Sequence, residues 1–121
     1  MAVLGTVGRD GAPACTSCWY DLDGELVLIT MYATAHRLAN VRRDPRVALT
    51  VLGEDPYMHV SLAGRVVRLW DDPRLEVMDR LSRRYTGQPW SEREPCVSAH
   101  VAIERWHTYG VRGAVPEYGV A

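Results

Sequence analysis

The stretch T-A-H-R-L-A-N-V-R-R-D-P-R-V, at residues 34–47, predicts one short helix followed by the start of a strand. Thr34 is expected to be the N-cap of this helix. Asp44 precedes Pro45 and is expected to end the helix, because a residue before proline avoids the α region. The positions that are expected to face a core are Leu38, Val41 and Ala35.

The placement of the cations on this helix leaves two interpretations open. Arg42 and Arg43 fall in the last turn, where the helix dipole favours positive charge. His36 and Arg37 fall in the first turn, where the dipole disfavours them by about a few tenths of a kcal/mol each. Either an anion binds at this helix N-terminus, or two exposed side chains tolerate a small penalty.

Length and composition indicate one ordinary globular domain over residues 1–121. Hydrophobic residues make up 47% of the chain, which is enough for a core, and the net charge of −1 gives no basic footprint for nucleic acid. No apolar run is long enough to span a membrane, so no membrane partner is expected and the expected location is the cytoplasm. All 14 basic residues are arginine, so a long basic side chain that binds a phosphate must be an arginine.

The cysteines do not predict a metal site. Cys15 and Cys18 form a C-x-x-C pattern, but on a strand these positions point to opposite faces. Only Cys96 remains, which is too few ligands for a zinc site. We therefore expect no metal and no disulfide framework.

Alternating and apolar runs predict a mainly β chain with two helices. A helix over 71–87 is the clearest, with Asp72 as its cap, Pro73 at its first position and Gly87 as its stop. Gly64 is expected to mark a bulge or bend in a long strand. Six short strands favour a closed or nearly closed antiparallel barrel. The expected strands are 2–7, 14–20, 26–31, 46–52, 57–69 and 97–104.

Six motifs, in order from about residue 3 to residue 110, carry a resemblance to a known family. They are G-T-V-G-R-D-G-A-P at 5–13, W-Y-D-L-D-G at 19–24, N-V-R-R-D-P-R-V-A-L at 40–49, P-Y at 56–57, G-R-V-V at 64–67 and R-Y-T-G at 84–87. The chain resembles the split β-barrel flavin- and deazaflavin-binding proteins related to pyridoxamine 5′-phosphate oxidase. The resemblance implies a six-stranded antiparallel split β-barrel, the FMN-binding fold of that family. It is closest to the branch that uses the deazaflavin coenzyme F-420, with the FMN-binding branch as the alternative.

The resemblance also implies a cofactor site at the first helix. Arg37 matches the position that holds the cofactor phosphate, and His36 precedes it where some relatives have another basic residue. Thr30 resembles a hydroxyl residue that reaches the same phosphate. Asn40 either supports this site from the next turn or braces the neighbouring loop. Ala35 departs from the pattern, because close deazaflavin relatives often have a second basic residue there.

Further residues are implied to lie near the cofactor ring. His59 resembles a glutamine that contacts the ring in FMN relatives, although a histidine on a strand can also be purely structural. Trp19 either packs near the ring or fills the barrel. The R-W-H-T-Y-G motif contains Trp106, His107 and Tyr109 and resembles a last strand that approaches the cofactor across a dimer. Relatives usually have a helix before the first strand, whereas Met1 is expected to lead almost directly into the strand here, so either the start is truncated or that helix is missing.

The function that the resemblance implies is hydride transfer from reduced coenzyme F-420 to a small conjugated substrate. The alternatives are an FMN-dependent oxidoreductase, and a protein that binds a cofactor or a tetrapyrrole without turnover. No residue stands out as a catalytic acid or base. The family implies a homodimer with cofactor sites at the interface. Loops at 53–57 and 87–95 are expected to shape the pocket for the substrate, which stays unidentified.

Overall fold

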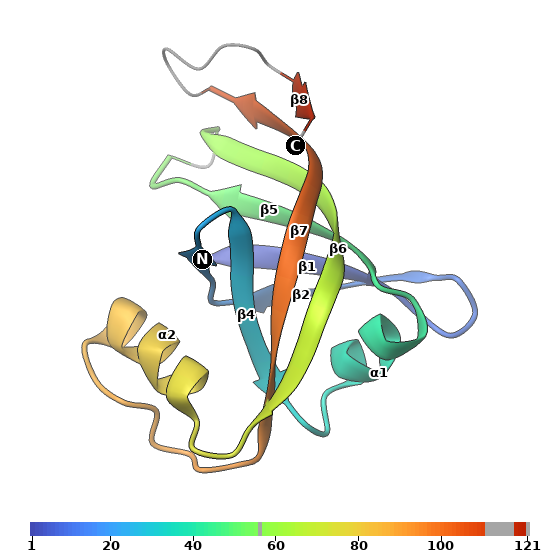
Figure 1. Cartoon of the computed structure of the whole chain (residues 1–121). Helices are drawn as coiled ribbons and strands as arrows, with labels where there is room; N and C mark the ends of the chain where they lie inside the picture. Colours follow the sequence, from blue (N-terminus) through green and yellow to red (C-terminus); the bar gives the residue numbers. More distant parts are fainter. Residues whose placement is uncertain (56, 111–117, 121) are drawn as a thin grey trace.

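The chain folds into an antiparallel β-sheet with two helices, as shown by a computed structural model that describes residues 1–55, 57–110 and 118–120 (Figure 1). The strands are β1 (Ala2–Val7), β2 (Pro13–Cys18), β3 (Asp21–Asp23), β4 (Leu26–Tyr32), β5 (Arg46–Leu52), β6 (His59–Asp72), β7 (Cys96–Tyr109) and β8 (Tyr118–Val120). The helices are α1 (His36–Arg43) and α2 (Glu76–Thr86). The prediction of a mainly β chain with two helices is confirmed.

The strand order is β2-β1-β5-β6-β7-β4-β3, with β8 paired to β7. All six expected strands form, but the count of six is wrong because β3 and β8 add two more. β3 consists of Asp21–Asp23, which lies outside the six expected strands, and it becomes a strand by pairing with β4. The end strands β2 and β3 do not pair with each other in the described part of the chain, so the expected closure of the barrel is not seen.

β6 and β7 are the two long strands on which the sheet bends. Their register shifts between Ala63 and Gly64, so the predicted bulge is confirmed. A Cβ atom at Gly64 would clash with the backbone carbonyl of Ala102 on β7. Glycine is therefore required here by the close approach of two backbones rather than by a special dihedral angle.

The first helix begins one residue later than expected. Ala35 is the N-cap in an extended conformation, and no side chain caps the helix, so the prediction of Thr34 as the cap is wrong. The reason is a tight turn in which the Ala35 N–H donates to the carbonyl of Tyr32 at 3.0 Å. Leu38 and Val41 are buried and Asp44 is extended before proline, as predicted.

The second helix begins at Glu76, so Pro73 is not its first residue as predicted. Asp72 nevertheless caps the helix, although it lies four residues before Glu76. Its carboxylate accepts the N–H groups of Glu76 at 2.9 Å and Val77 at 2.8 Å. Leu75 makes this geometry possible by taking a left-handed conformation with φ of 56°. Gly87 ends the helix with φ of 79°, as expected.

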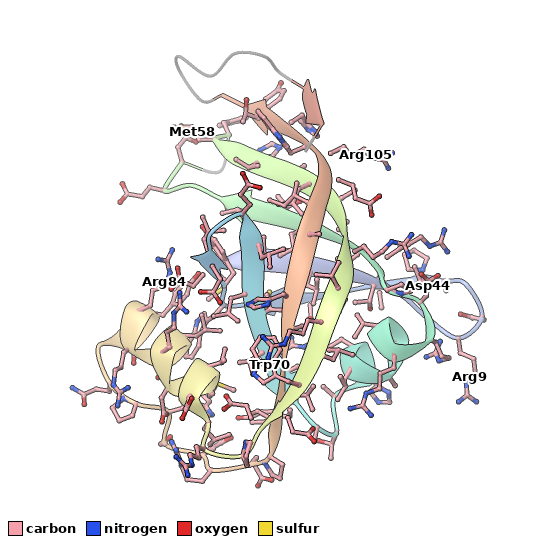
Figure 2. The ribbon with its side chains drawn as sticks, in the orientation of Figure 1. Arg9, Asp44, Met58, Trp70, Arg84 and Arg105 are labelled. Carbon is pink, nitrogen blue, oxygen red and sulfur yellow. The ribbon has the colours of Figure 1, made fainter. Side chains whose placement is uncertain are left out.

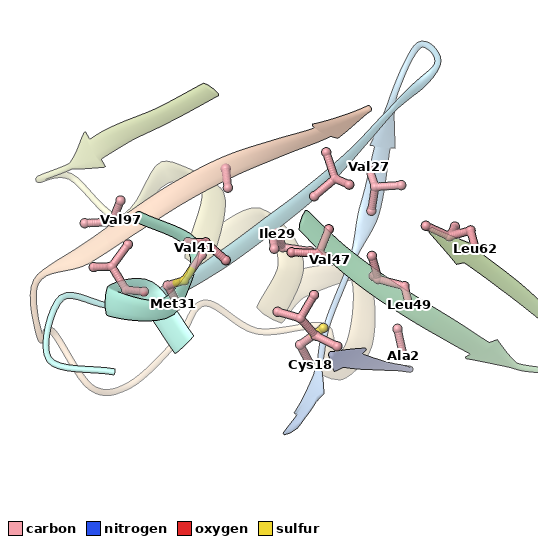
Figure 3. Close-up of a cluster of buried hydrophobic side chains, with 14 residues drawn as sticks. Ala2, Cys18, Val27, Ile29, Met31, Val41, Val47, Leu49, Leu62 and Val97 are labelled. Atoms are coloured by element: carbon pink, nitrogen blue, oxygen red, sulfur yellow. The ribbon is translucent and has the colours of Figure 1, made fainter. Parts of the chain in front are cut away.

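Buried side chains form two clusters. The larger one fills the concave side of the sheet and is closed by α1 (Figure 3). The smaller one lies under α2 and contains Leu75, Met78 and Cys96, with Trp19 and Trp90 packed against it. This smaller cluster, with its two tryptophans, borders a cavity.

Candidate functional site

A cavity of about 200 Å³ lies where β2, β4, the first turn of α1 and α2 meet. It brings together three of the residues that the sequence indicated, Arg37, Thr30 and Trp19. The remaining lining residues are Met1, Ser17, Cys18, Tyr32, Met78, Leu81 and Trp90. The cavity thus has one cationic side and one aromatic side.

The guanidinium of Arg37 is fixed between β2 and β4. Its Nη1 donates to the hydroxyl of Thr16 at 2.9 Å and to the carbonyl of Ser17 at 3.3 Å. Its Nη2 donates to the carbonyl of Thr30 at 3.4 Å. Its Nε is buried and has no acceptor in the described part of the chain. An unpaired buried donor costs about 1–3 kcal/mol, so this side chain has unused capacity for an anion.

The N-terminus of α1 is also suited to an anion. No acidic residue lies in the first turn, and no side chain caps its free N–H groups. His36 is exposed at the start of the same turn. The helix dipole and the uncapped N–H groups therefore add to the charge of Arg37.

Thr30 lies in the cavity wall, but its hydroxyl is already engaged. The Oγ1 atom donates to the carbonyl of Val97 at 3.3 Å and is 3.0 Å from the Oγ of Ser98. The expected contact with a phosphate would require this hydroxyl to change partners. In the structure, Thr30 instead holds Arg37 through its backbone carbonyl.

Asn40 braces α1 against the sheet. Its buried side-chain amide donates to the hydroxyl of Thr6 on β1 at 3.0 Å. Its carbonyl oxygen accepts from Nη2 of Arg43 at 2.7 Å. Asn40 does not line the cavity, and its support of a cofactor site stays a prediction.

Trp19 forms the aromatic side of the cavity with two partners. Its ring stacks on Tyr85 of α2, with ring centroids 5.4 Å apart and an angle of 10° between the planes. Its edge meets Trp90 at 5.3 Å and 88°. Such stacked and edge-to-face arrangements are favourable for aromatic pairs. Trp19 therefore serves both the packing under α2 and the cavity wall.

Two arginines fasten α2 to the β3–β4 hairpin and so hold the cavity wall in place. Arg80 pairs with Asp21 at 3.0 Å and with Asp23 at 2.7 Å. Arg84, also of α2 and labelled in Figure 2, pairs with Asp21 at 3.4 Å. His100 of β7 completes the network, with its Nε2 2.8 Å from Asp23. The His100 hydrogen bond and Arg80 together lower the pKa of Asp23.

Sequence reasoning missed Tyr32 and Trp90, which meet at the edge of the cavity. The indole Nε1 of Trp90 donates to the hydroxyl of Tyr32 at 2.9 Å, and that hydroxyl donates to Glu92 at 2.8 Å. Burial is the largest cause of the raised pKa of Tyr32. The sequence predicts that the 87–95 loop shapes the pocket, and Trp90 of this loop lines the cavity, but the sequence does not single out that residue. The described residues of the 53–57 loop do not line this cavity.

The family model named pyridoxamine 5′-phosphate oxidase matches residues 1–110. The chain belongs to the pyridoxamine 5′-phosphate oxidase family. Among solved structures, an F-420 reductase is 28% identical, with a TM-score of 0.79 over 87% of this chain and 86% of the other.

Two further structures share the fold of the pyridoxamine 5′-phosphate oxidase family. A conserved hypothetical protein from Mycobacterium tuberculosis is 25% identical, with a TM-score of 0.71 over 99% of this chain and 83% of the other. A heme-binding protein from Mycobacterium smegmatis is 19% identical, with a TM-score of 0.69 over 98% of this chain and 52% of the other. No curated protein sequence matches the chain.

His59 does not line the cavity that contains Arg37. His59 is the first residue of β6, and this strand begins in the upper part of Figure 1, whereas α1 lies at the lower right. Its ring stacks on Tyr109 at 5.3 Å and lies 6.4 Å from the ring of His107. His59 and Arg37 therefore belong to separate clusters within one chain. A shared role toward one ligand stays a prediction.

The cysteines lie as their spacing on a strand predicted. Cys15 is exposed and Cys18 is buried, and all three cysteines are free. Burial raises the pKa of the Cys18 thiol. Within residues 1–55, 57–110 and 118–120, no three His, Cys, Asp or Glu side chains gather as they would around a metal ion. Neither of the two described helices has the length and apolar character needed to cross a membrane.

Proposed function

We propose that this chain is a reductase that uses reduced coenzyme F-420 to reduce a small conjugated molecule. The observation that carries the proposal is the Arg37 guanidinium, which is fixed at the wall of a cavity beside the uncapped N-terminus of α1. Support comes from the F-420 reductase that shares 28% identity over most of both chains. When bound, the cofactor would supply the hydride.

The residues present fit the phosphate end of such a cofactor. Arg37 has a buried Nε without an acceptor in the described part of the chain, and α1 offers free N–H groups. The cavity of about 200 Å³ is smaller than the roughly 300–1,000 Å³ of pockets for drug-sized ligands. It therefore suits one part of a cofactor, and the remainder would lie outside this cavity.

In this proposal the chain binds and orients, and the cofactor performs the chemistry. Arg37 would neutralise the phosphate, and His36 lies beside it in the same turn. Trp19 gives the apolar side against which a ring can pack. Met78 and Leu81 of α2 exclude water from that side. No side chain is assigned as proton donor.

FMN is the alternative cofactor, because Arg37 would hold its phosphate equally well. Binding without turnover, of either cofactor or of a tetrapyrrole, is the third possibility. A heme-binding protein shares the fold at 19% identity, which supports the fold and no more.

We also propose a homodimer. Strand β2 lies at one end of the sheet, and its residues 13–17 are exposed. Next to it an open concavity of about 870 Å³ extends across β1, β5 and β6, with Gly5, Ala48 and Gly64 among the residues that line it. An edge strand with an open face beside it is a natural surface for a second copy. Static light scattering tests this, because a monomer at micromolar concentration would contradict it.

The test of the proposed function is direct. Purified protein is titrated separately with F-420 and FMN, and fluorescence reports binding. Reduced F-420 is then added with a panel of quinones and nitroaromatic compounds, and absorbance follows its oxidation. Tight F-420 binding with turnover of at least one acceptor supports the proposal. Preferential FMN binding moves the chain to the flavin branch, and binding without turnover supports the non-catalytic alternative.

A further inference from the structure

One wall of the cavity differs from the others in how it is built. Trp90 comes from residues 88–95, which form neither helix nor strand. The facing residues stand on regular elements, with Cys18 at the end of β2, Thr30 in β4 and Leu81 in α2. No backbone ladder fixes residues 88–95, so the position of Trp90 depends on side-chain contacts.

Side-chain contacts hold this wall in place. The backbone N–H of Trp90 donates to Oδ1 of Asp79 at 3.1 Å, and Nη1 of Arg93 pairs with the same oxygen at 2.8 Å. The indole N–H is fixed separately, by the hydroxyl of Tyr32. The hydrogen bond from Arg93 is the largest cause of the lowered pKa of Asp79. Asp79 thus anchors the backbone at Trp90, and Tyr32 holds its ring.

The position of the ring limits what can enter. Trp90 meets the edge of Trp19 at 5.3 Å and nearly at a right angle. Between these rings and the side chains of Met78 and Leu81, the cavity offers about 200 Å³. A flat ring can pack against such aromatic side chains in a stacked or edge-to-face arrangement, and a cavity of about 200 Å³ leaves little room for a larger group.

We propose that Trp90 is the specificity-determining residue of the cavity and that, placed by Asp79, it admits a small planar ring and excludes larger groups. The ligand class is therefore a flat aromatic or conjugated group carried beside the anion that Arg37 binds. This inference rests on the proposed function only in treating the cavity as the ligand site. It names no cofactor.

Cys18 allows a test without any cofactor, because this residue lines the same cavity and carries a free thiol. In a Cys15→Ser background, Cys18 is alkylated with N-ethylmaleimide, which is small, or with pyrene maleimide, which is bulky. The blank is the Cys15→Ser, Cys18→Ser protein, in which only Cys96 remains. Mass spectrometry gives the rate of modification at each cysteine. Circular dichroism confirms that each variant is folded.

With Trp90 in place, we expect the bulky reagent to modify Cys18 far more slowly than the small one. Trp90→Ala should raise the ratio of the bulky to the small rate by roughly tenfold, because the lost indole leaves a large gap. Asp79→Asn, which keeps the shape but weakens the Arg93 pair, should raise the same ratio by a smaller factor. Asp79→Asn also tests the inference if Trp90→Ala does not fold.

Two results would overturn the inference. One is an unchanged ratio in the folded Trp90→Ala and Asp79→Asn variants. The other is equal access of both reagents to Cys18 in the parent protein. Neither result depends on cofactor binding, so they are distinguishable from a failure of the F-420 titration. If F-420 does not bind but the ratio changes as expected, the proposed cofactor is wrong and the role of Trp90 stands.

Discussion

Nη1 of Arg37 donates to the hydroxyl of Thr16 at 2.9 Å, which joins the first turn of α1 to β2. These residues are 21 positions apart in the sequence. The contact explains how a cation can lie at the positive end of a helix dipole, because the guanidinium is turned toward oxygen atoms of the sheet. It also fixes the direction from which Arg37 can meet an anion.

Thr16→Val should weaken cofactor binding without unfolding the protein. The substitution removes the hydroxyl acceptor of Arg37 but keeps a β-branched side chain suited to a strand. We expect about a fivefold loss of affinity, which corresponds to a net hydrogen bond of about 1 kcal/mol. Fluorescence titration measures it. Thr50→Val is the matched control, because that hydroxyl contacts Ser61, away from the cavity. Equal losses in both variants would contradict the role of Thr16.

Asp23→Asn should change how stability depends on pH. His100 and Arg80 lower the pKa of Asp23 in the folded protein, so folding favours its ionised form. Its contribution is complete above the unfolded value of 3.8 and is lost as the pH falls through the lower folded value.

The measurement for Asp23 is the urea midpoint across acidic and neutral pH. We expect the Asn variant to be less stable at about pH 7 and to lose less stability on acidification. Glu25→Gln, on the adjacent turn, is the control. A variant with the acid dependence of the parent would show that the network around Asp23 does not contribute.

Gly64→Ala should destabilise the fold. The added Cβ would meet the Ala102 carbonyl on β7, and a backbone atom cannot move aside cheaply. We expect a loss of about 1–3 kcal/mol in the free energy of unfolding, measured by urea denaturation. Gly5→Ala is the matched control, since its Cβ would lie 3.7 Å from Ala48 in ordinary contact. Equal stability of the two variants would contradict the packing at the bulge.

The features that the sequence predicted correctly depend on local chemistry. Leu38 and Val41 follow the helical period, and Gly87 ends α2 because glycine takes a left-handed conformation readily. The position of Arg37 in the first turn of α1 follows in the same way. A carboxylate cap from Asp72 was also predictable, although the helix begins further along the chain.

The features that the sequence did not predict are either too short to show a period or depend on distant partners. β3 forms only because Asp21–Asp23 pairs with β4, and three residues carry no period. The hydroxyl of Thr30 turns to Ser98, 68 positions away, rather than toward the cavity. Trp90 stands in a loop without regular structure, and its place at the cavity is set by Asp79 and Tyr32. Such long-range contacts leave no local pattern to read.

The measurement that tests the central claim most directly is the dissociation constant of F-420 for the parent protein, Arg37→Ala and Arg42→Ala. Arg42 is an exposed arginine of the same helix, so it controls for the loss of one positive charge. The account predicts micromolar binding by the parent, a loss of roughly tenfold or more for Arg37→Ala, and little change for Arg42→Ala. Equal binding by Arg37→Ala and the parent would contradict it, as would the absence of F-420 binding by the parent.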